Sequence, residues 1–488
     1  ETDADRRADE EEERTGHARF RFQFRKLWAH TGPGWLAALA YTDPGNIASD
    51  LQAGVSTGYA LLWVLLLATL IGLLMQLLAV RLGVVTGLNF AEQCRLRYPR
   101  PVYLLLWLMM ELAVISSDVQ EVIGTAIALN IMTLGWLPLW GGVLVTLVDT
   151  FVFLFLENFG VRYLEAFFGL LIAVMAIAFG VEYVLAAPPQ LDVLKGTFVP
   201  SITVPQVPVA TAMLGAVVMP HNVPLHSALV QSRVINRNYR HRVRDSNVYN
   251  SMEASVALLV SFVINLFVVA VFAATFHDKK TGGHDGNDWE LHEAGEKLAE
   301  KFGDVAKYVW AVGLLASGQS STMTGVYAGQ VTMQGFLQLK IKPWKRVLLT
   351  RSLAIVPAVV VAVVATNQLG LLDNLMNIAQ SLLLPFAVLP LLRLTSDASV
   401  MGAHFVNPLW LSAIVWLLGV GIVAINIYLV VIEIPRGAGW YWWFLLGIGS
   451  AVYFAACAYL LLWTYVASPV LRLLRCCCRG RRWPLVLR

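Results

Sequence analysis

The sequence predicts an all-α polytopic membrane protein with twelve transmembrane helices, and three observations support this fold class. Of the 488 residues, 57% are hydrophobic and only 14% are charged, whereas soluble domains carry roughly 25% charged residues. The apolar residues gather in segments of about 20, the length that an α-helix needs to cross a bilayer. Basic residues cluster in alternate connections between these segments, as they do in cytosolic loops. Lipid is therefore the solvent for most of this chain.

Twelve apolar segments have the length of a spanning helix. They cover residues 34–52, 59–80, 103–129, 137–156, 166–186, 207–230, 255–276, 309–337, 348–366, 372–392, 409–432 and 440–465. With the N-terminus in the cytosol, the basic connections fall on the cytosolic side, and the acidic connection at residues 277–304 falls on the other. We therefore expect an integral, multi-pass protein with both termini in the cytosol. The sequence does not distinguish the plasma membrane from an endolysosomal or vacuolar membrane.

Two of these segments are interrupted at matching places. The first contains Asp43-Pro44-Gly45-Asn46 and the sixth contains Met219-Pro220-His221-Asn222. Proline removes a backbone donor, and interrupted segments at corresponding places in two halves are the best sequence indication of a transporter site between inverted repeats. We therefore expect helices 1 and 6 to be broken at mid-membrane, with packing kinks as the alternative.

These breaks also predict how the chain is organised. Each break opens a repeat of five helices, and two further helices follow the second repeat. The predicted parts are a cytosolic N-terminal tail (residues 1–30), inverted repeat 1 with helices 1–5 (31–186), inverted repeat 2 with helices 6–10 (187–394), helices 11–12 (395–466), and a basic cytosolic C-terminal tail (467–488). In that tail, Cys476, Cys477 and Cys478 are candidates for S-palmitoylation beside the membrane, or alternatively for handing metal to the cytosol.

Several classes of protein are excluded or disfavoured. The chain has no glycine-rich phosphate loop ending in Lys-Ser or Lys-Thr, so an ion gradient, the membrane potential or the substrate's own gradient must drive any transport. The five cysteines suggest no disulfide framework, and the N-terminus does not resemble a secretory signal peptide. No nucleophile–base pair indicates an enzyme. We expect no bound cofactor and no nucleic-acid partner; the partners that we expect are membrane lipid and small ions, bound by a monomer.

The side chains at the two breaks indicate what binds there. Asp43 offers an anionic oxygen, Asn46 a neutral oxygen and Met219 a thioether sulfur, and the freed carbonyl of Ala216 is a fourth donor. Calcium and magnesium prefer shells made only of oxygen, whereas a thioether suits softer transition metals. The set therefore favours Mn²⁺, Fe²⁺, Co²⁺ or Cd²⁺ without choosing among them. The alternative is that Met219 only fills the apolar core.

A third pattern lies in the third segment. Glu111, Asp118 and Glu121 stand seven and three residues apart, so they share one face of a helix. An acidic stripe inside a membrane helix can relay protons. The alternative is that these acids form a structural network with arginines such as Arg351.

The two break motifs resemble those of the Nramp family of proton-coupled divalent metal transporters. Residues 318–330, Gly-Gln-Ser-Ser-Thr-Met-Thr-Gly-Val-Tyr-Ala-Gly-Gln, are similar to the transport signature of that family in helix 8. The resemblance covers the whole membrane-spanning length. It implies a LeuT-type fold, alternating access and symport of Mn²⁺ or Fe²⁺ with protons into the cytosol, with Cd²⁺ and Co²⁺ also accepted.

The resemblance also implies roles for individual residues. The metal ligands would be Asp43, Asn46, Met219, the carbonyl of Ala216, and Gln380 of helix 10. The proton pathway would include Asp43, His221, Glu111, Asp118, Glu121, Arg351 and His226. Pro224 departs from the usual pattern of the family, as do Thr42, Ser116 and Ser117; by its residue type, Pro224 can extend the break in helix 6.

Three other functions compete with metal–proton symport. Sodium-coupled amino-acid uptake on the same fold and magnesium transport by a relative are both disfavoured by Met219. Signalling, as in the plant ethylene-signalling proteins with an Nramp-like membrane domain, is disfavoured because both break motifs are intact and no large soluble tail follows residue 465.

Overall fold

The computed structural model describes residues 20, 22–156, 161–277, 291–338, 343–364, 369–432 and 447–460, and these residues contain helices and no strand. The chain divides into two compact units, Glu1–Leu429 and Val430–Arg488. Outside the described residues lie most of the predicted N-terminal tail and the whole of the predicted C-terminal tail with Cys476, Cys477 and Cys478.

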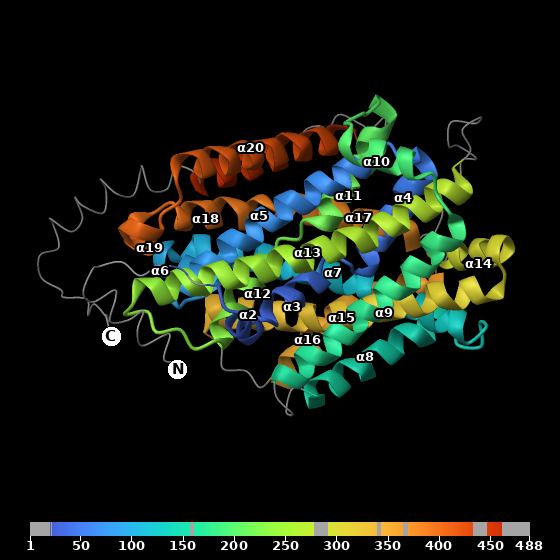
Figure 1. Ribbon diagram of the computed structural model, residues 1–488, viewed down its shortest axis with the longest axis horizontal. Helices are drawn as coiled ribbons and strands as arrows, with labels where there is room; N and C mark the ends of the chain where they lie inside the picture. The colour runs from blue at the N-terminus through green and yellow to red at the C-terminus, as the bar shows by residue number, and fades with distance from the viewer. Residues whose placement is uncertain are drawn as a thin grey trace, which may run out of the picture. The chain divides into compact units, whose positions relative to one another are not determined.

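The first unit begins with a series of helices that contains the first five predicted spans (Figure 1). They are α2 (Phe24–His30), α3 (Pro33–Leu39), α4 (Pro44–Thr57), α5 (Leu62–Thr86), α6 (Phe90–Arg97), α7 (Arg100–Met132), α8 (Leu139–Leu156), α9 (Val161–Ala186) and α10 (Gln190–Phe198).

The second series contains the next six predicted spans. It consists of η2 (Val204–Gln206), α11 (Val207–Val217), α12 (Asn222–Leu229), η3 (Val230–Ser232), α13 (Arg240–Phe276), α14 (Leu291–Phe302), α15 (Asp304–Leu337), α16 (Pro343–Val364), α17 (Leu369–Leu383), α18 (Pro385–Thr395), α19 (Ala398–Phe405) and α20 (Leu409–Ile432). Within the second unit, the helix Gly447–Leu460 lies in the twelfth predicted span.

Six stretches of the described helices are long and apolar enough to cross a membrane by length and composition. They are Leu62–Thr86, Arg100–Met132, Ala166–Ala186, Arg240–Phe276, Leu372–Thr395 and Leu409–Tyr428. The first and sixth predicted spans are each divided into two shorter helices, so they fall outside this length criterion. The total of twelve spans stays a prediction.

Helices α7 and α15 pack closely because glycines of α15 face polar residues of α7. A Cβ atom on Gly325 would lie 2.7 Å from Asp118 Oδ1, and one on Gly318 would overlap Thr125 Oγ1. Small residues of this kind let membrane helices approach each other closely. The two glycines lie in the stretch that resembles the transport signature, so part of that stretch is explained by packing.

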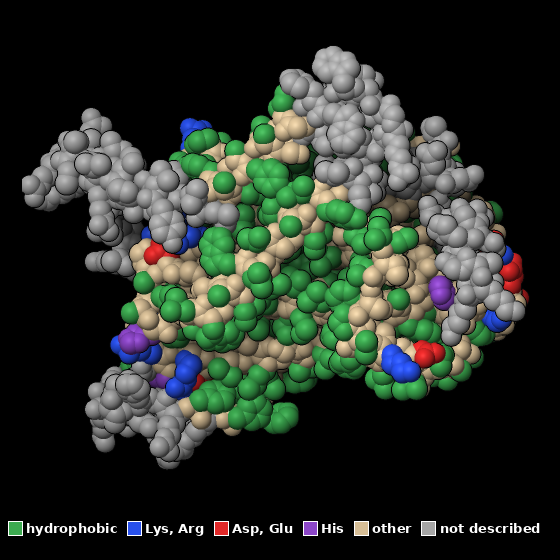
Figure 2. All heavy atoms as spheres, turned by 90° about the horizontal axis from the view of Figure 1, so that it is seen from above, with side chains coloured by type: hydrophobic (Ala, Val, Ile, Leu, Met, Phe, Trp, Pro, Cys, Tyr) green, Lys and Arg blue, Asp and Glu red, His purple; other side chains and the backbone are tan. Residues whose placement is uncertain are grey.

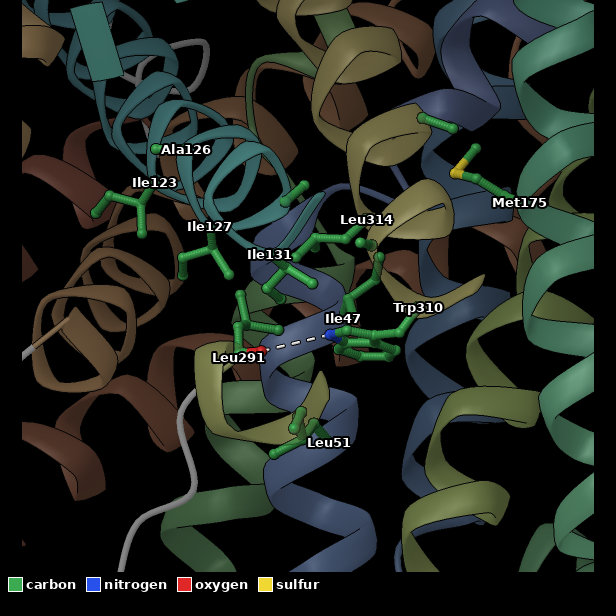
Figure 3. Packing of buried hydrophobic residues seen from close by; sticks show 14 of the residues in the cluster. Ile47, Leu51, Ile123, Ala126, Ile127, Ile131, Met175, Leu291, Trp310 and Leu314 are labelled. Carbon is green, nitrogen blue, oxygen red and sulfur yellow. Dashed lines mark hydrogen bonds between the residues drawn. The ribbon is translucent and has the colours of Figure 1, made fainter. Parts of the chain in front are cut away.

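The apolar core lies between α4, α7, α9, α14 and α15 (Figure 3). Ile47 and Leu51 of α4 belong to one buried cluster with Ile127 of α7 and Trp310 of α15. Trp310 Nε1 also donates to the backbone carbonyl of Leu291 at 3.4 Å, which ties α14 to the core. Charged side chains of α14 are exposed on its opposite face, as expected for charged residues that lie in water.

Charged side chains gather at the two ends of the horizontal axis in Figure 2, with a broad band of hydrophobic side chains between them. Such a band between polar ends is the pattern that a bilayer selects.

Candidate metal-binding site at two helix breaks

The first break lies between α3, which ends at Leu39, and α4, which begins at Pro44. Asp43 is the N-cap of α4, with extended backbone angles of φ −74° and ψ 167°. Its Oδ1 atom accepts hydrogen bonds from the backbone N and the side-chain Nδ2 of Asn46, both at 2.8 Å. Pro44 occupies the first helical position, where its missing N–H breaks no helical bond. The Asp-Pro-Gly-Asn motif is therefore a capped helix start placed inside a span.

The carbonyl groups around this break are bonded by side chains of other helices. The donors are Ser261 Oγ to the carbonyl of Ala38 (3.1 Å), Asn265 Nδ2 to that of Tyr41 (2.8 Å) and Ser317 Oγ to that of Thr42 (2.5 Å). Irregular backbone at membrane depth requires such internal partners, because lipid offers none. Helices α13 and α15 thus hold the first break in place.

The second break lies between Val217, the last residue of α11, and Asn222, the first residue of α12. In a continuous helix the N–H of residue 220 would bond the carbonyl of Ala216, but Pro220 has no N–H. Met219 and His221 are both buried within this break. Position 220 therefore offers the carbonyl of Ala216 no helical hydrogen bond.

The expectation that Pro224 extends this break is wrong. Helix α12 already begins at Asn222, so Pro224 lies in its first turn. Proline is tolerated there because the first N–H groups of a helix have no intrahelical partner.

Contacts through α7 and α17 bring the two breaks into one neighbourhood. A Cβ atom on Gly45 would lie 2.6 Å from the side-chain carbon Cδ of Gln120, and the amide of Gln120 is hydrogen-bonded to that of Gln380 at 2.8 Å. On the other side, a Cβ atom on Gly215 would lie 2.6 Å from the backbone carbonyl of Asn377 in α17. The first break and Gln380 are therefore linked through Gln120, and the end of the helix before the second break packs against the same helix α17.

Three oxygen atoms in this region have no hydrogen-bond partner. They are Asp43 Oδ2, Asn46 Oδ1 and Gln380 Oε1, and each of the three residues is 0% exposed. Buried polar atoms are nearly always paired in folded proteins, so three unpaired acceptors around the breaks are candidates for binding a cation. The described residues contain no group of three or more His, Cys, Asp and Glu side chains able to hold a metal ion. A cation here would instead depend on one carboxylate, two amides, a thioether and a backbone carbonyl.

The two histidines of α12 and its cap have different surroundings. His226 Nδ1 lies 2.6 Å from Gln76 Oε1, and Gln76 Nε2 donates to the hydroxyl of Tyr41 at 3.0 Å. A chain of polar contacts thus connects α12, α5 and the first break. His221 is buried at the N-cap position of α12, next to Met219 and Pro220.

The three acids of α7 are buried, and two of them, Asp118 and Glu121, lie against α15. Glu121 Oε1 accepts from the hydroxyl of Ser117 at 3.0 Å, and both Asp118 and Glu121 lie next to Gly325. Glu111 lies two turns closer to the start of the helix. The side chain of Arg351 is outside the described residues, although α16, which carries it, packs against α7.

Sequence reasoning missed four polar residues near the breaks. Gln120 lies between Asp118 and Glu121 on α7, and Asp373 and Asn377 share a face of α17 with Gln380, at spacings of four and three residues. Asp50 lies seven residues after Asp43 on α4, and neither of its carboxylate oxygens has a partner. The available signal was the same for all four: a polar side chain on the site-facing stripe of an apolar helix.

Comparison with known proteins gives consistent matches. Residues 34–432 match the family model described as natural resistance-associated macrophage protein-like. The chain is 55% identical over 408 residues to a metal transporter nramp1 homolog of Dictyostelium discoideum, covering 84% of this chain and 75% of that protein. It is 52% identical over 436 residues to natural resistance-associated macrophage protein 2 of Homo sapiens, covering 85% and 77% of the two chains.

Solved structures agree with these matches. A manganese transporter of Eremococcus coleocola, solved in complex with an aromatic bis-isothiourea substituted compound, superposes with a TM-score of 0.82 at 31% identity, covering 92% of this chain and 97% of that one. The inward-facing conformation of Mhp1 has a TM-score of 0.52 at 15% identity, covering 83% and 90%. That second likeness concerns the fold alone and, with the first, confirms the LeuT-type class.

Proposed function

This chain belongs to the Nramp family of metal transporters, and on that premise we propose that it carries Mn²⁺ and Fe²⁺ into the cytosol together with protons, by alternating access. As a family member it is an integral, multi-pass membrane protein that transports metal ions, and it is not an enzyme. We further propose that Cd²⁺ and Co²⁺ are accepted, and that both termini lie in the cytosol.

The observation that supports the metal site best is the group of unpaired oxygens. Asp43 Oδ2, Asn46 Oδ1 and Gln380 Oε1 are buried acceptors without partners, and leaving such atoms unpaired costs about 1–3 kcal/mol each. A divalent cation bound among them would satisfy all three at once. We propose that these atoms, the Ala216 carbonyl and the Met219 sulfur are its ligands.

The ligand chemistry favours transition metals over calcium and magnesium. Asp43 is the single anionic ligand in this set, and Met219 supplies the soft donor that calcium and magnesium do not use. Four of the five donors are hard oxygens, which suits Mn²⁺ and Fe²⁺, while the sulfur extends the range to Cd²⁺.

Proton coupling follows from the chemistry of Asp43. A carboxylate must be deprotonated to bind metal, so arrival of the ion displaces any proton that Asp43 holds. We propose that His221, His226 and the acids of α7, Glu111, Asp118 and Glu121, carry protons away, with Arg351 at the exit. The acids are buried along one face of α7, which gives the proton a path apart from a doubly charged ion.

The test is uptake by the purified protein in liposomes. We expect Mn²⁺ uptake to be accompanied by proton entry, to increase when the outside is acidic, and to be reduced by Fe²⁺ and Cd²⁺ but not by Mg²⁺ or Ca²⁺. Asp43→Ala should abolish both uptake and Mn²⁺ binding, whereas Asp304→Ala, which removes an exposed aspartate at the start of α15, should leave them unchanged. Mn²⁺ uptake at the wild-type rate by Asp43→Ala would refute the site.

A further inference from the structure

Gln120 makes three hydrogen bonds from α7 to α17. Its Nε2 donates to the backbone carbonyl of Asp373 at 3.2 Å and to Asn377 Oδ1 at 2.8 Å. Its Oε1 accepts from Gln380 Nε2 at 2.8 Å. The side chain is 1% exposed, and these bonds use both of its hydrogens.

These bonds determine which way both amides point. Nitrogen and oxygen of an amide side chain look alike, so the orientation must be inferred from partners whose role is certain. The Asp373 carbonyl is such a partner, because a backbone carbonyl can only accept. Gln120 must therefore turn its NH₂ group toward Asp373, which leaves its oxygen facing Gln380.

The orientation of Gln380 follows from that of Gln120. An amide oxygen can only accept, so Gln380 must present its own NH₂ group to Gln120. Its Oε1 then points elsewhere, and it is one of the three oxygens without a partner. The backbone carbonyl of Asp373 thus fixes the orientation of the Gln120 amide. That amide in turn fixes the orientation of Gln380, whose Oε1 atom is the one that the proposed metal site needs.

Gln120 also contacts the first break directly. The nearest atoms to a Cβ on Gly45 would be Cδ and Nε2 of Gln120, both at 2.6 Å, so any larger residue at position 45 would collide with this amide. The glycine of the Asp-Pro-Gly-Asn motif thus leaves space for Gln120. The side chain of Gln120 therefore contacts the start of α4 and fixes the orientation of the Gln380 amide in α17.

We propose that Gln120 is a positioning residue that holds Gln380 with its carbonyl oxygen toward the transported metal ion. It does not bind the ion itself, because its own oxygen and both hydrogens are engaged. The proposal rests on the proposed function, since it takes Gln380 as a metal ligand. Without Gln120, the Gln380 amide is free to rotate and to turn its NH₂ group toward the cation.

The test replaces Gln120 by methionine, which keeps an unbranched side chain of similar length and lacks the amide. We expect the KM for Mn²⁺ to rise about tenfold, the effect of losing one oxygen contact to a cation, while the maximal rate stays near that of the wild type. Gln93→Met, at a buried glutamine of α6 outside the breaks, is the matched control and should leave the KM unchanged.

A double-mutant cycle separates positioning from a general structural role. Gln380→Leu removes the oxygen itself, so adding Gln120→Met to it should cause no further rise in KM. If the two effects multiply instead, Gln120 acts independently of Gln380 and the proposal is wrong. It is equally wrong if Gln120→Met keeps the wild-type KM.

A second variant covers the case in which Gln120→Met does not fold. Gln120→Asn keeps an amide but is one methylene shorter, so it cannot reach Gln380 and Asp373 together, and it should show the same rise in KM. The Asp43→Ala protein is assayed in parallel: if it still takes up Mn²⁺, the metal site fails, whereas loss of uptake there with normal KM in the Gln120 variants rejects the positioning role alone.

Discussion

The two helix breaks look alike in sequence but are held in different ways. Carbonyls at the first break accept hydrogen bonds of 2.5–3.1 Å from Ser261, Asn265 and Ser317 of α13 and α15. At the second break the turn bonds are backbone contacts of 3.3–3.4 Å, such as Asn222 N to the Met219 carbonyl, and His221 caps α12 without a side-chain hydrogen bond. Short bonds to neighbouring helices fix the first break more firmly than long bonds within one turn fix the second.

This difference suggests that the two breaks have different roles in metal binding. The first break supplies the carboxylate of Asp43, whose position is fixed by its cap bonds to Asn46, and the start of α3 is anchored as well, because Glu253 of α13 accepts a bond from Gly32 N. The second break supplies the thioether of Met219, on a flexible side chain, in a loosely bonded turn. We infer that the first break determines whether a cation binds and the second determines which cation is preferred.

The largest expected effect comes from loosening the first break. Asn265→Leu removes the donor to the carbonyl of Tyr41 and leaves it buried and unpaired, which should lower the free energy of unfolding by about 1–3 kcal/mol. Thermal unfolding of the purified protein in detergent measures this change, and Mn²⁺ uptake should fall with it.

The control for this prediction lies on the same helix. Ser255 bonds only within α13, to the carbonyl of Ser251, so Ser255→Ala should change the unfolding temperature little. If Asn265→Leu is as stable and as active as Ser255→Ala, the first break does not depend on α13 and the contrast between the breaks disappears.

A smaller and more selective effect is expected at the second break. Met219→Ala removes the sulfur and leaves the oxygen ligands, so Cd²⁺ affinity should fall about tenfold, or roughly 1.4 kcal/mol, while part of the Mn²⁺ uptake remains. Calcium, which prefers oxygen ligands, should begin to compete. Competition assays in liposomes measure both changes, and continued exclusion of Ca²⁺ would place selectivity outside the second break.

The contrast between the breaks also shows which parts of the site can be predicted from the sequence. Asp43, Asn46 and Met219 were proposed as ligands from residue type and from their place beside a proline, because a carboxylate inside a membrane span is rarely without a function. Their supporting residues were not identified. Ser261, Asn265 and Gln120 are ordinary polar residues in apolar helices, and only the packing of α13 against α3 and of α17 against α7 assigns each its partner. The short helices α2, α6 and α14 were missed because they lie in connections without a spanning pattern.

The smallest expected effect concerns the proton route beside the first break. Asp118 lies on α7 against Gly325 of α15, and it shares a helical face with Glu121 and Glu111. If protons leave Asp43 along this face while metal continues past the second break, the two routes share only their entrance. The inside-negative membrane potential already favours cation entry by about 2.3 kcal/mol per charge per 100 mV, so metal can move even when proton transfer is impaired.

Asp118→Asn should therefore lower proton flux more than metal uptake, because asparagine keeps the size of the side chain but cannot take up and release a proton at these pH values. Both fluxes are measured in the same liposomes, with a pH-sensitive dye and radioactive Mn²⁺. Asp192→Asn, at a residue of α10 away from both breaks, is the matched control and should leave the ratio of protons to metal unchanged. A fall of both fluxes in strict proportion in Asp118→Asn would mean that one common path carries the metal and the proton, and the first break would then control proton release as well as metal binding.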